Sequence, residues 1–180
     1  MEFEKICIAA KKACESETKG SYAKLVGELI KKGLTVSTAE SCTGGLIGKL
    51  FTDVSGASAV FLGGMITYTN HIKINKLGVL AETIEKHTEV SFECAAEMAT
   101  RAREFFETDI GVSATGYAGP TGGTESDPVG TVYLGVSTKD RTVVYRLGFE
   151  DCNRNDIRYG TAFAAVKSII REISARFLKK

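Results

Sequence analysis

Histidine is scarce in this chain of 180 residues, which contains only His71 and His87, sixteen positions apart. Neither residue belongs to an H-E-x-x-H motif or to a Cys/His cluster with the spacing of zinc ligands. The five cysteines are an odd number without a C-x-x-C pair, a pattern typical of reduced thiols. We therefore expect no protein-held transition metal, and we expect no metal site and no cofactor.

The chain also lacks an excess of charge of one sign, because it contains 23 Lys and Arg residues and 22 Asp and Glu residues. Its formal net charge is +1. Domains that bind nucleic acid or anionic membranes usually carry a basic excess, so we expect neither partner. No apolar run approaches the roughly 20 residues that span a bilayer. The N-terminus lacks a basic segment followed by an apolar signal core, which predicts a cytoplasmic protein.

A composition of 43% hydrophobic and 25% charged residues is ordinary for a soluble globular protein. A chain of this length suits one compact domain, expected over residues 21–180 after an N-terminal helical extension at 1–20. Apolar residues at helical spacing predict helices over residues 2–16, 22–32, 44–51, 71–77, 91–106 and 153–178. Strand patterns cover residues 34–37, 59–68, 110–115, 130–137 and 142–149, of which the last two alternate like an antiparallel hairpin. This order predicts an α/β fold, a single-domain three-layer helix/sheet/helix sandwich with a mixed sheet that includes the hairpin.

The stretch TAESCTGG at residues 38–45 joins a predicted strand to a predicted helix and is rich in hydroxyl groups and glycines. A helix N-terminus presents unpaired amides and about half a positive charge, so Ser41 could act there as a nucleophile. The amides of Thr43, Gly44 and Gly45 could then hold a developing oxyanion. Alternatively, Ser41 or Thr43 merely caps the helix, and this stretch by itself favours the cap. The cysteine that follows Ser41 has no histidine base nearby in sequence and is interpreted as structural.

The segment TYTNHIK at residues 67–73 places Tyr68 at the end of a predicted strand and Lys73 in the first turn of the next helix. A cation is disfavoured at a helix N-terminus, which would lower the pKa of Lys73. A neutral lysine can deprotonate a serine and a tyrosine can relay the proton, so Ser41, Tyr68 and Lys73 could perform acyl transfer without histidine. The alternative is an exposed lysine and a core tyrosine, which the spacing alone favours.

The loop TGYAGPTGGT, which begins at residue 115, contains four glycines and three threonines. Its amides and hydroxyls could surround a phosphate or a ring, although it matches neither the P-loop nor the Rossmann pattern. Arg154 and Arg158 stand one helical turn apart at the start of the last predicted helix, so both could bind one anion. Equally, the loop could be a generic one, and the arginines could pair with neighbouring surface carboxylates.

In their order along the chain, these segments resemble the CinA C-terminal domain family, which includes the nicotinamide-nucleotide amidases. The resemblance rests on ESCTGG, FLGGMITYTNHIK, TGYAGPTGG, PVGTVY and NRNDIR, which begin at residues 40, 61, 115, 128 and 153. Two positions depart from the family pattern. An arginine can stand before the second glycine where this chain has Gly63, and many members differ at the position of Thr121. Either departure could change substrate affinity without removing the serine.

The resemblance implies hydrolysis of the carboxamide of nicotinamide mononucleotide to nicotinate mononucleotide and ammonia. It assigns catalysis to a serine, a tyrosine and a lysine that match Ser41, Tyr68 and Lys73. The residues expected to bind the substrate are Thr43, Gly44, Gly45, Thr115, Gly116, Gly119, Gly122, Arg154 and Arg158. Such domains are commonly homo-oligomers, so we expect a homo-oligomer here. The alternative is a non-catalytic pyridine-nucleotide-binding or regulatory domain, which would have no need of all three catalytic residues.

Overall fold

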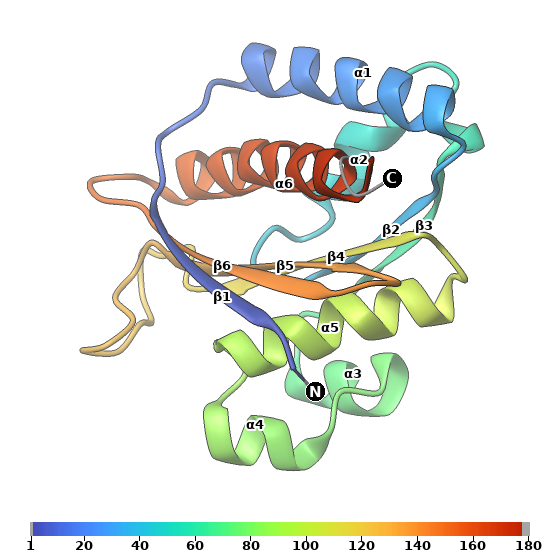
Figure 1. Cartoon of the computed structure of the whole chain (residues 1–180). Coiled ribbons are helices and arrows are strands. Elements are labelled where there is room, and N and C mark those ends of the chain that lie inside the picture. Colours follow the sequence, from blue (N-terminus) through green and yellow to red (C-terminus); the bar gives the residue numbers. More distant parts are fainter. Residues whose placement is uncertain (1, 178–180) are drawn as a thin grey trace.

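A six-stranded mixed sheet forms the centre of the structure, with its strands in the order β1-β6-β5-β4-β2-β3 (Figure 1). The computed structural model describes residues 2–177, and side chains as far as residue 175. The strands are β1 (Glu4–Ala9), β2 (Val36–Glu40), β3 (Phe61–Ile66), β4 (Ile110–Gly116), β5 (Thr131–Thr138) and β6 (Thr142–Gly148). The helices are α1 (Glu15–Lys32), α2 (Leu46–Thr52), α3 (Asn70–Ile72), α4 (Ala81–His87), α5 (Phe92–Phe105) and α6 (Arg154–Phe177), with a 3₁₀ segment η1 (Ala57–Ala59) and a π-helix η2 (Lys73–Leu77).

Neighbouring strands are parallel except at β5, which runs antiparallel to both β4 and β6. β5 and β6 are joined by residues 139–141 and form the expected hairpin. The prediction of a mixed sheet that includes an antiparallel hairpin is therefore confirmed. Because β2, β3 and β4 run in the same direction, their carboxyl ends lie at one edge of the sheet.

Helices cover both faces of the sheet (Figure 1). On one face lie α2 and α6, with α1 packed on both of them, and on the other lie α3, α4 and α5. The larger core includes Ile47, Leu134 and Ile169, which are fully buried between α2, α6 and the sheet. Met98 and Ala102, one helical turn apart on α5, belong to a second cluster on the opposite face. The three-layer helix/sheet/helix sandwich is thus confirmed.

The predicted N-terminal helix at residues 2–16 is wrong. Glu4–Ala9 forms β1, and the first helix begins only at Glu15. β1 pairs in parallel with β6 along its whole length, so its backbone groups are satisfied by a strand distant in sequence. The β-branched residues Ile6 and Ile8 suit a strand better than a helix. The N-terminal extension is therefore an added edge strand of the sheet.

Several other boundaries differ from expectation by a few residues. β2 extends further toward the C-terminus than the predicted strand at 34–37, and β3 is shorter at both ends than the predicted strand at 59–68. The helix predicted over 71–77 is capped by Thr69 and becomes the π-helix η2. The last predicted helix is α6, and its predicted end at Leu178 lies outside the described residues.

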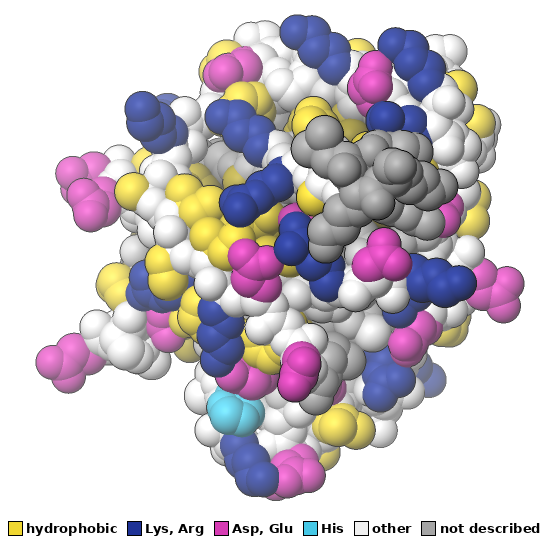
Figure 2. All heavy atoms as spheres, viewed as in Figure 1, with side chains coloured by type: hydrophobic (Ala, Val, Ile, Leu, Met, Phe, Trp, Pro, Cys, Tyr) yellow, Lys and Arg dark blue, Asp and Glu magenta, His cyan; other side chains and the backbone are white. Residues whose placement is uncertain are grey.

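The surface carries both signs of charge side by side. Figure 2 shows dark-blue and magenta side chains interspersed over the visible face rather than gathered by sign. Ion pairs such as Lys5–Glu93 at 2.7 Å and Lys12–Asp156 at 2.9 Å contribute to this mixture. Within residues 2–177, no helix combines the length and the apolar character needed to cross a membrane.

Candidate active site

The carboxyl ends of β2, β3 and β4 bring together three segments that the sequence singled out. Ser41 directly follows β2, Thr67 directly follows β3, and Thr115 is near the end of β4. The Ser41 amide donates to the Ala114 carbonyl oxygen at 2.8 Å, and the Thr67 amide donates to the Glu40 carbonyl oxygen at 2.7 Å. These bonds continue the sheet pairing beyond the strands. Ligands commonly bind in α/β proteins just beyond such strand ends.

The side chains of Ser41 and Lys73 are in direct contact, with the Lys73 Nζ 3.1 Å from the Ser41 Oγ. The Nζ also donates to the carbonyl oxygen of Thr67 at 2.9 Å, which fixes its position. Ser41 is 8% exposed and Lys73 only 1%. Burial lowers the pKa of Lys73, because the ammonium loses water, while Cys94 and Glu89 partly oppose this effect. The pair therefore has the geometry of a nucleophile beside its base.

Lys73 owes its position to the short segment between β3 and η2. Thr69 caps α3 through its side-chain oxygen, and the Lys73 amide donates to the Thr69 carbonyl oxygen at 3.0 Å. Single turns of π-helix occur often at functional sites, and η2 begins at Lys73 itself. The sequence pointed to a helix N-terminus as the reason for a lowered pKa. Burial is the larger cause, because α3 has only three residues and little dipole.

The turn after Ser41 depends on two glycines in left-handed conformation, with φ of 61° at Gly44 and 93° at Gly45. The Gly44 amide donates to the Ser41 carbonyl oxygen at 3.1 Å, and the Leu46 amide donates to that of Thr43 at 3.2 Å. One of the three expected oxyanion donors, the Gly44 amide, is therefore already engaged. The amides of Thr43 and Gly45 donate to no acceptor among residues 2–177.

Glu40, to which the sequence gave no role, caps helix α2. Its carboxylate accepts hydrogen bonds from the amides of Ile47 at 3.0 Å and Gly48 at 2.8 Å. The side chain is only 1% exposed, and a negative charge is favourable at a helix N-terminus. Because Glu40 stands seven residues before Ile47, it falls outside the capping-box spacing that a sequence reveals. Glu40 holds the two ends of the turn that carries Ser41.

Cys42 lies next to Ser41 and belongs to the buried main core. Burial, with a smaller effect of the Glu40 charge, raises the pKa of Cys42 to about 12. The thiolate is the nucleophilic form of cysteine, and this thiol remains protonated at neutral pH. These properties support the structural interpretation of Cys42.

The sequence led us to expect that Tyr68 bridges Lys73 and Ser41, but it does not. Its side chain is 59% exposed, and its hydroxyl accepts a hydrogen bond from the Arg154 Nη2 at 3.2 Å. Arg154 also donates through Nη1 to the carbonyl oxygen of Gly119 at 2.6 Å. Since the lysine already contacts the serine, no relay between them is needed. Tyr68 instead belongs with Arg154 and the glycine-rich loop.

Arg158, which was expected to bind an anion, is engaged with the backbone of the protein itself. Its Nε and Nη2 both donate to the Thr43 carbonyl oxygen, at 2.9 and 2.5 Å. The residue ties α6 to the turn after Ser41. A Cβ atom at Gly44 would lie 3.2 Å from the Arg158 Nη2, so the glycine leaves room for this contact.

A cavity of about 260 Å³ opens at this end of the sheet. The predicted residues that line it are Ser41, Tyr68, Lys73, Thr115, Gly116, Gly119 and Arg154. The predicted residues that do not line it are Thr43, Gly44, Gly45, Gly122 and Arg158. Glu89 also lines the cavity. No sequence signal marked it, because it lies in a polar stretch without a motif.

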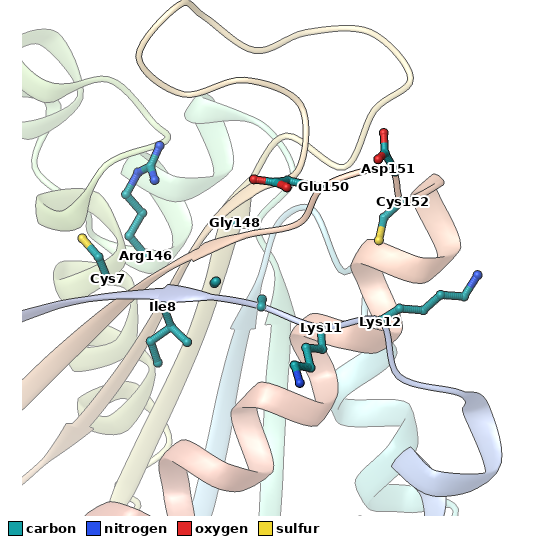
Figure 3. Close-up of a pocket in the computed structure, with 11 residues that line it drawn as sticks. Cys7, Ile8, Lys11, Lys12, Arg146, Gly148, Glu150, Asp151 and Cys152 are labelled. Atoms are coloured by element: carbon teal, nitrogen blue, oxygen red, sulfur yellow. The ribbon is translucent and has the colours of Figure 1, made fainter.

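A larger cavity of about 680 Å³ lies between β1 and the segment after β6 (Figure 3). Figure 3 shows the side chains of Arg146, Lys12 and Asp151 spread around the pocket rather than turned toward one point. Arg146 is paired with Asp127 and Lys12 with Asp156, so these groups do not converge on one ligand. Within the described part of the chain, no group of three or more His, Cys, Asp or Glu side chains is placed to hold a metal.

Relatives with similar sequences are named either for competence-damage induction or for their likeness to CinA. A Halothermothrix orenii protein named for competence-damage induction is 49% identical over 154 residues, which cover 84% of this chain and 37% of that protein. A CinA-like protein of Kosmotoga olearia is 46% identical over 154 residues, which cover 85% of this chain and 37% of that protein. The chain thus spans little more than a third of the length of these relatives.

Solved structures of similar proteins share the fold. A competence/damage inducible protein of Agrobacterium tumefaciens is 36% identical with a TM-score of 0.83, covering 86% of this chain and 94% of that one. The competence damage-inducible protein A of Klebsiella pneumoniae is 29% identical with a TM-score of 0.84, and the match covers 87% of this chain and 97% of that one. Residues 19–173 match the family model of the CinA C-terminal domain. The chain therefore belongs to the CinA C-terminal domain family.

Proposed function

We propose that this chain is a nicotinamide-nucleotide amidohydrolase, which converts nicotinamide mononucleotide to nicotinate mononucleotide and ammonia. The observation that carries the proposal is the contact of 3.1 Å between the Lys73 Nζ and the Ser41 Oγ in a buried site. A serine beside a lysine of lowered pKa is an activated nucleophile for acyl transfer. Membership of the CinA family is compatible with this activity, although the names of the relatives state no substrate.

In the acylation step, neutral Lys73 accepts the hydroxyl proton of Ser41 while the Ser41 Oγ bonds to the carboxamide carbon. The carbonyl oxygen becomes negative and is stabilised by backbone amides of the turn. The amides of Thr43 and Gly45 are the candidates, because that of Gly44 is engaged, and since neither residue lines the cavity the turn has to shift when the substrate binds. The carbon–nitrogen bond then breaks, and Lys73 returns its proton to the leaving nitrogen, which departs as ammonia.

In the deacylation step, a water molecule loses a proton to Lys73 and its oxygen attacks the acyl carbon. The ester bond to Ser41 breaks, and the Ser41 Oγ regains the proton from Lys73. The product is nicotinate mononucleotide. Neither step calls for a metal ion or another cofactor.

The nucleotide phosphate is assigned to Arg154, which lines the cavity and projects from the first turn of α6. A guanidinium has five N–H donors, and two of its nitrogens contact Gly119 and Tyr68. The remaining donors can bind an anion, while Thr115 and Gly116 line the space for the ribose.

Ammonia release from nicotinamide mononucleotide tests the proposal, with the wild type measured beside Ser41→Ala and Cys42→Ala. We expect the wild type and Cys42→Ala to release ammonia, and Ser41→Ala to be slower by about 10⁴-fold or more. Calorimetry should show that Ser41→Ala still binds the nucleotide, which separates loss of chemistry from loss of folding. A wild type that binds the nucleotide without releasing ammonia would instead be the non-catalytic binding domain.

A further inference from the structure

The cavity that contains Ser41 and Lys73 receives charges of opposite sign from opposite faces of the sheet. Arg154 begins α6 on one face, and Glu89 lies just before α5 on the other (Figure 1). Glu89 is the single acidic residue among the described residues that line this cavity. Among residues 2–177, no group hydrogen-bonds to or ion-pairs with its carboxylate, so this charge is available to a ligand.

The backbone of Glu89 is fixed against the end of β4. The buried Thr115 donates through its Oγ1 to the Glu89 carbonyl oxygen at 2.7 Å. Thr88, which precedes Glu89, has φ of 69° and ψ of 169°, a conformation that β-branched residues rarely adopt. Val90 is buried and Ser91 caps α5, which fixes the other side. Backbone strain of this kind is common where a segment is positioned for a ligand.

The negative charge of Glu89 acts on groups at other sides of the cavity. It contributes, after burial, to the raised pKa of Tyr117, and it opposes the lowering of the pKa of Lys73. Tyr117 lines the same cavity. The face of an aromatic ring attracts cations, so a tyrosine and a carboxylate together suit a flat, positively charged group.

We propose that Glu89 and Tyr117 bind the charged ring of the substrate, and that Glu89 makes the site prefer a cationic ring to a neutral one. The inference rests on the proposed function, in which the carboxamide presented to Ser41 belongs to a pyridinium nucleotide. Such a ligand has a positive ring and a negative phosphate, which match Glu89 and Arg154. The 1,4-dihydro form of the ring has nearly the same shape and no charge, so a carboxylate distinguishes the two by charge.

Binding of oxidised and reduced nicotinamide mononucleotide, measured by calorimetry on the full chain with Ser41→Ala, tests this selectivity. We expect Glu89→Gln to raise the Kd of the oxidised nucleotide about tenfold and that of the reduced nucleotide by less than about twofold. Glu89→Asp keeps the charge and should keep the preference. Glu85→Gln removes the same charge from the exposed surface of α4 and should change neither Kd.

If Glu89→Gln raised the Kd of both nucleotides equally, or changed neither Kd, the role of Glu89 would be contradicted. Ammonia release is measured separately with Ser41 intact. Its absence, with the charge preference retained, would contradict the amidase and leave Glu89 as the selectivity residue. If the chain with Ser41→Ala binds neither nucleotide, both proposals are wrong.

Discussion

A lysine side chain that is 1% exposed keeps its charge at a cost, because burial removes the water that solvates an ammonium. The pKa of Lys73 in the folded protein is lowered from the value of 10.5 expected for an unfolded chain. Between these two pKa values the unfolded chain binds more protons than the folded one, so the stability contributed by Lys73 rises with pH across this window. Burial of Lys73 lowers the stability of the folded protein at pH values below this window. The same burial makes the lysine easier to deprotonate, and so supplies a neutral base.

The pH dependence of the reaction follows from this base. We expect kcat/KM for nicotinamide mononucleotide to rise with pH and to level off above the folded-state pKa of Lys73. Lys73→Arg cannot be deprotonated at these pH values and should lower kcat/KM by about 10³-fold or more. Initial rates of ammonia release over acid, neutral and alkaline buffers would measure both effects. A flat profile in the wild type would contradict Lys73 as the base.

The thiols should react according to their burial. Cys14 is exposed, and hydrogen bonds from Ser16 and from the Glu17 amide lower its pKa, whereas burial raises that of Cys42 to about 12. We therefore expect iodoacetamide at neutral pH to alkylate Cys14 rapidly and Cys42 only after denaturation. Mass spectrometry of the peptides measures both positions in one sample. Equal labelling of the two in the folded protein would contradict the burial of Cys42.

The motifs at the ends of two apolar strands made Ser41 and Lys73 candidates, but the resemblance to the CinA family, and not the spacing, assigned catalysis to them. The sequence could not identify the partners of Tyr68 and Arg158. Whether an arginine reaches a ligand or a carbonyl oxygen of its own chain depends on the distance between α6 and the turn at Thr43, which are far apart in sequence. Such contacts between distant segments leave no periodic signal.

At the scale of elements, helix α2 and the turn before it depend on one buried carboxylate. The Glu40 carboxylate accepts hydrogen bonds from two backbone amides of α2. The side chain is buried, so water could not take its place as the acceptor for these amides. We expect Glu40→Ala to lower the free energy of unfolding by about 2 to 3 kcal/mol, because it leaves buried donors unpaired. Urea denaturation measures the change, and Glu85→Gln on exposed α4 serves as the control. A loss below about 0.5 kcal/mol, the usual limit for surface substitutions, would contradict the cap.

The elements with strong periodicity, such as α5, α6 and the β5–β6 hairpin, were predictable because local pattern and tertiary packing agree. β1 was not, because its residues pair with β6, more than a hundred positions away in the sequence. It is also mostly exposed, so its sequence lacks the clean alternation of a half-buried strand. The family match over residues 19–173 leaves β1 outside.

At the scale of the whole molecule, β3 is an edge strand with an exposed apolar face. Leu62, Gly64 and Ile66 share that face, and the side chains of Leu62 and Ile66 are 49% and 58% exposed. We expect a homo-oligomer that covers this face, since burial of such side chains favours association. Light scattering should give a mass above that of one chain, and Leu62→Glu with Ile66→Glu should reduce it. Ile30→Glu, at an exposed position of α1, is the control, and a monomeric wild type would contradict the expectation.

In the proposed reaction, the carboxamide carbon passes through an ester on Ser41. Hydroxylamine competes with water for such an acyl group, so its products report the intermediate even when it does not accumulate. The most direct measurement is therefore the reaction of nicotinamide mononucleotide with the wild type and with Ser41→Ala in the presence of hydroxylamine. We expect the wild type to form the hydroxamate at the expense of nicotinate mononucleotide, and Ser41→Ala to form neither. Hydrolysis by the wild type without any hydroxamate, or hydroxamate formation by Ser41→Ala, would contradict the serine mechanism.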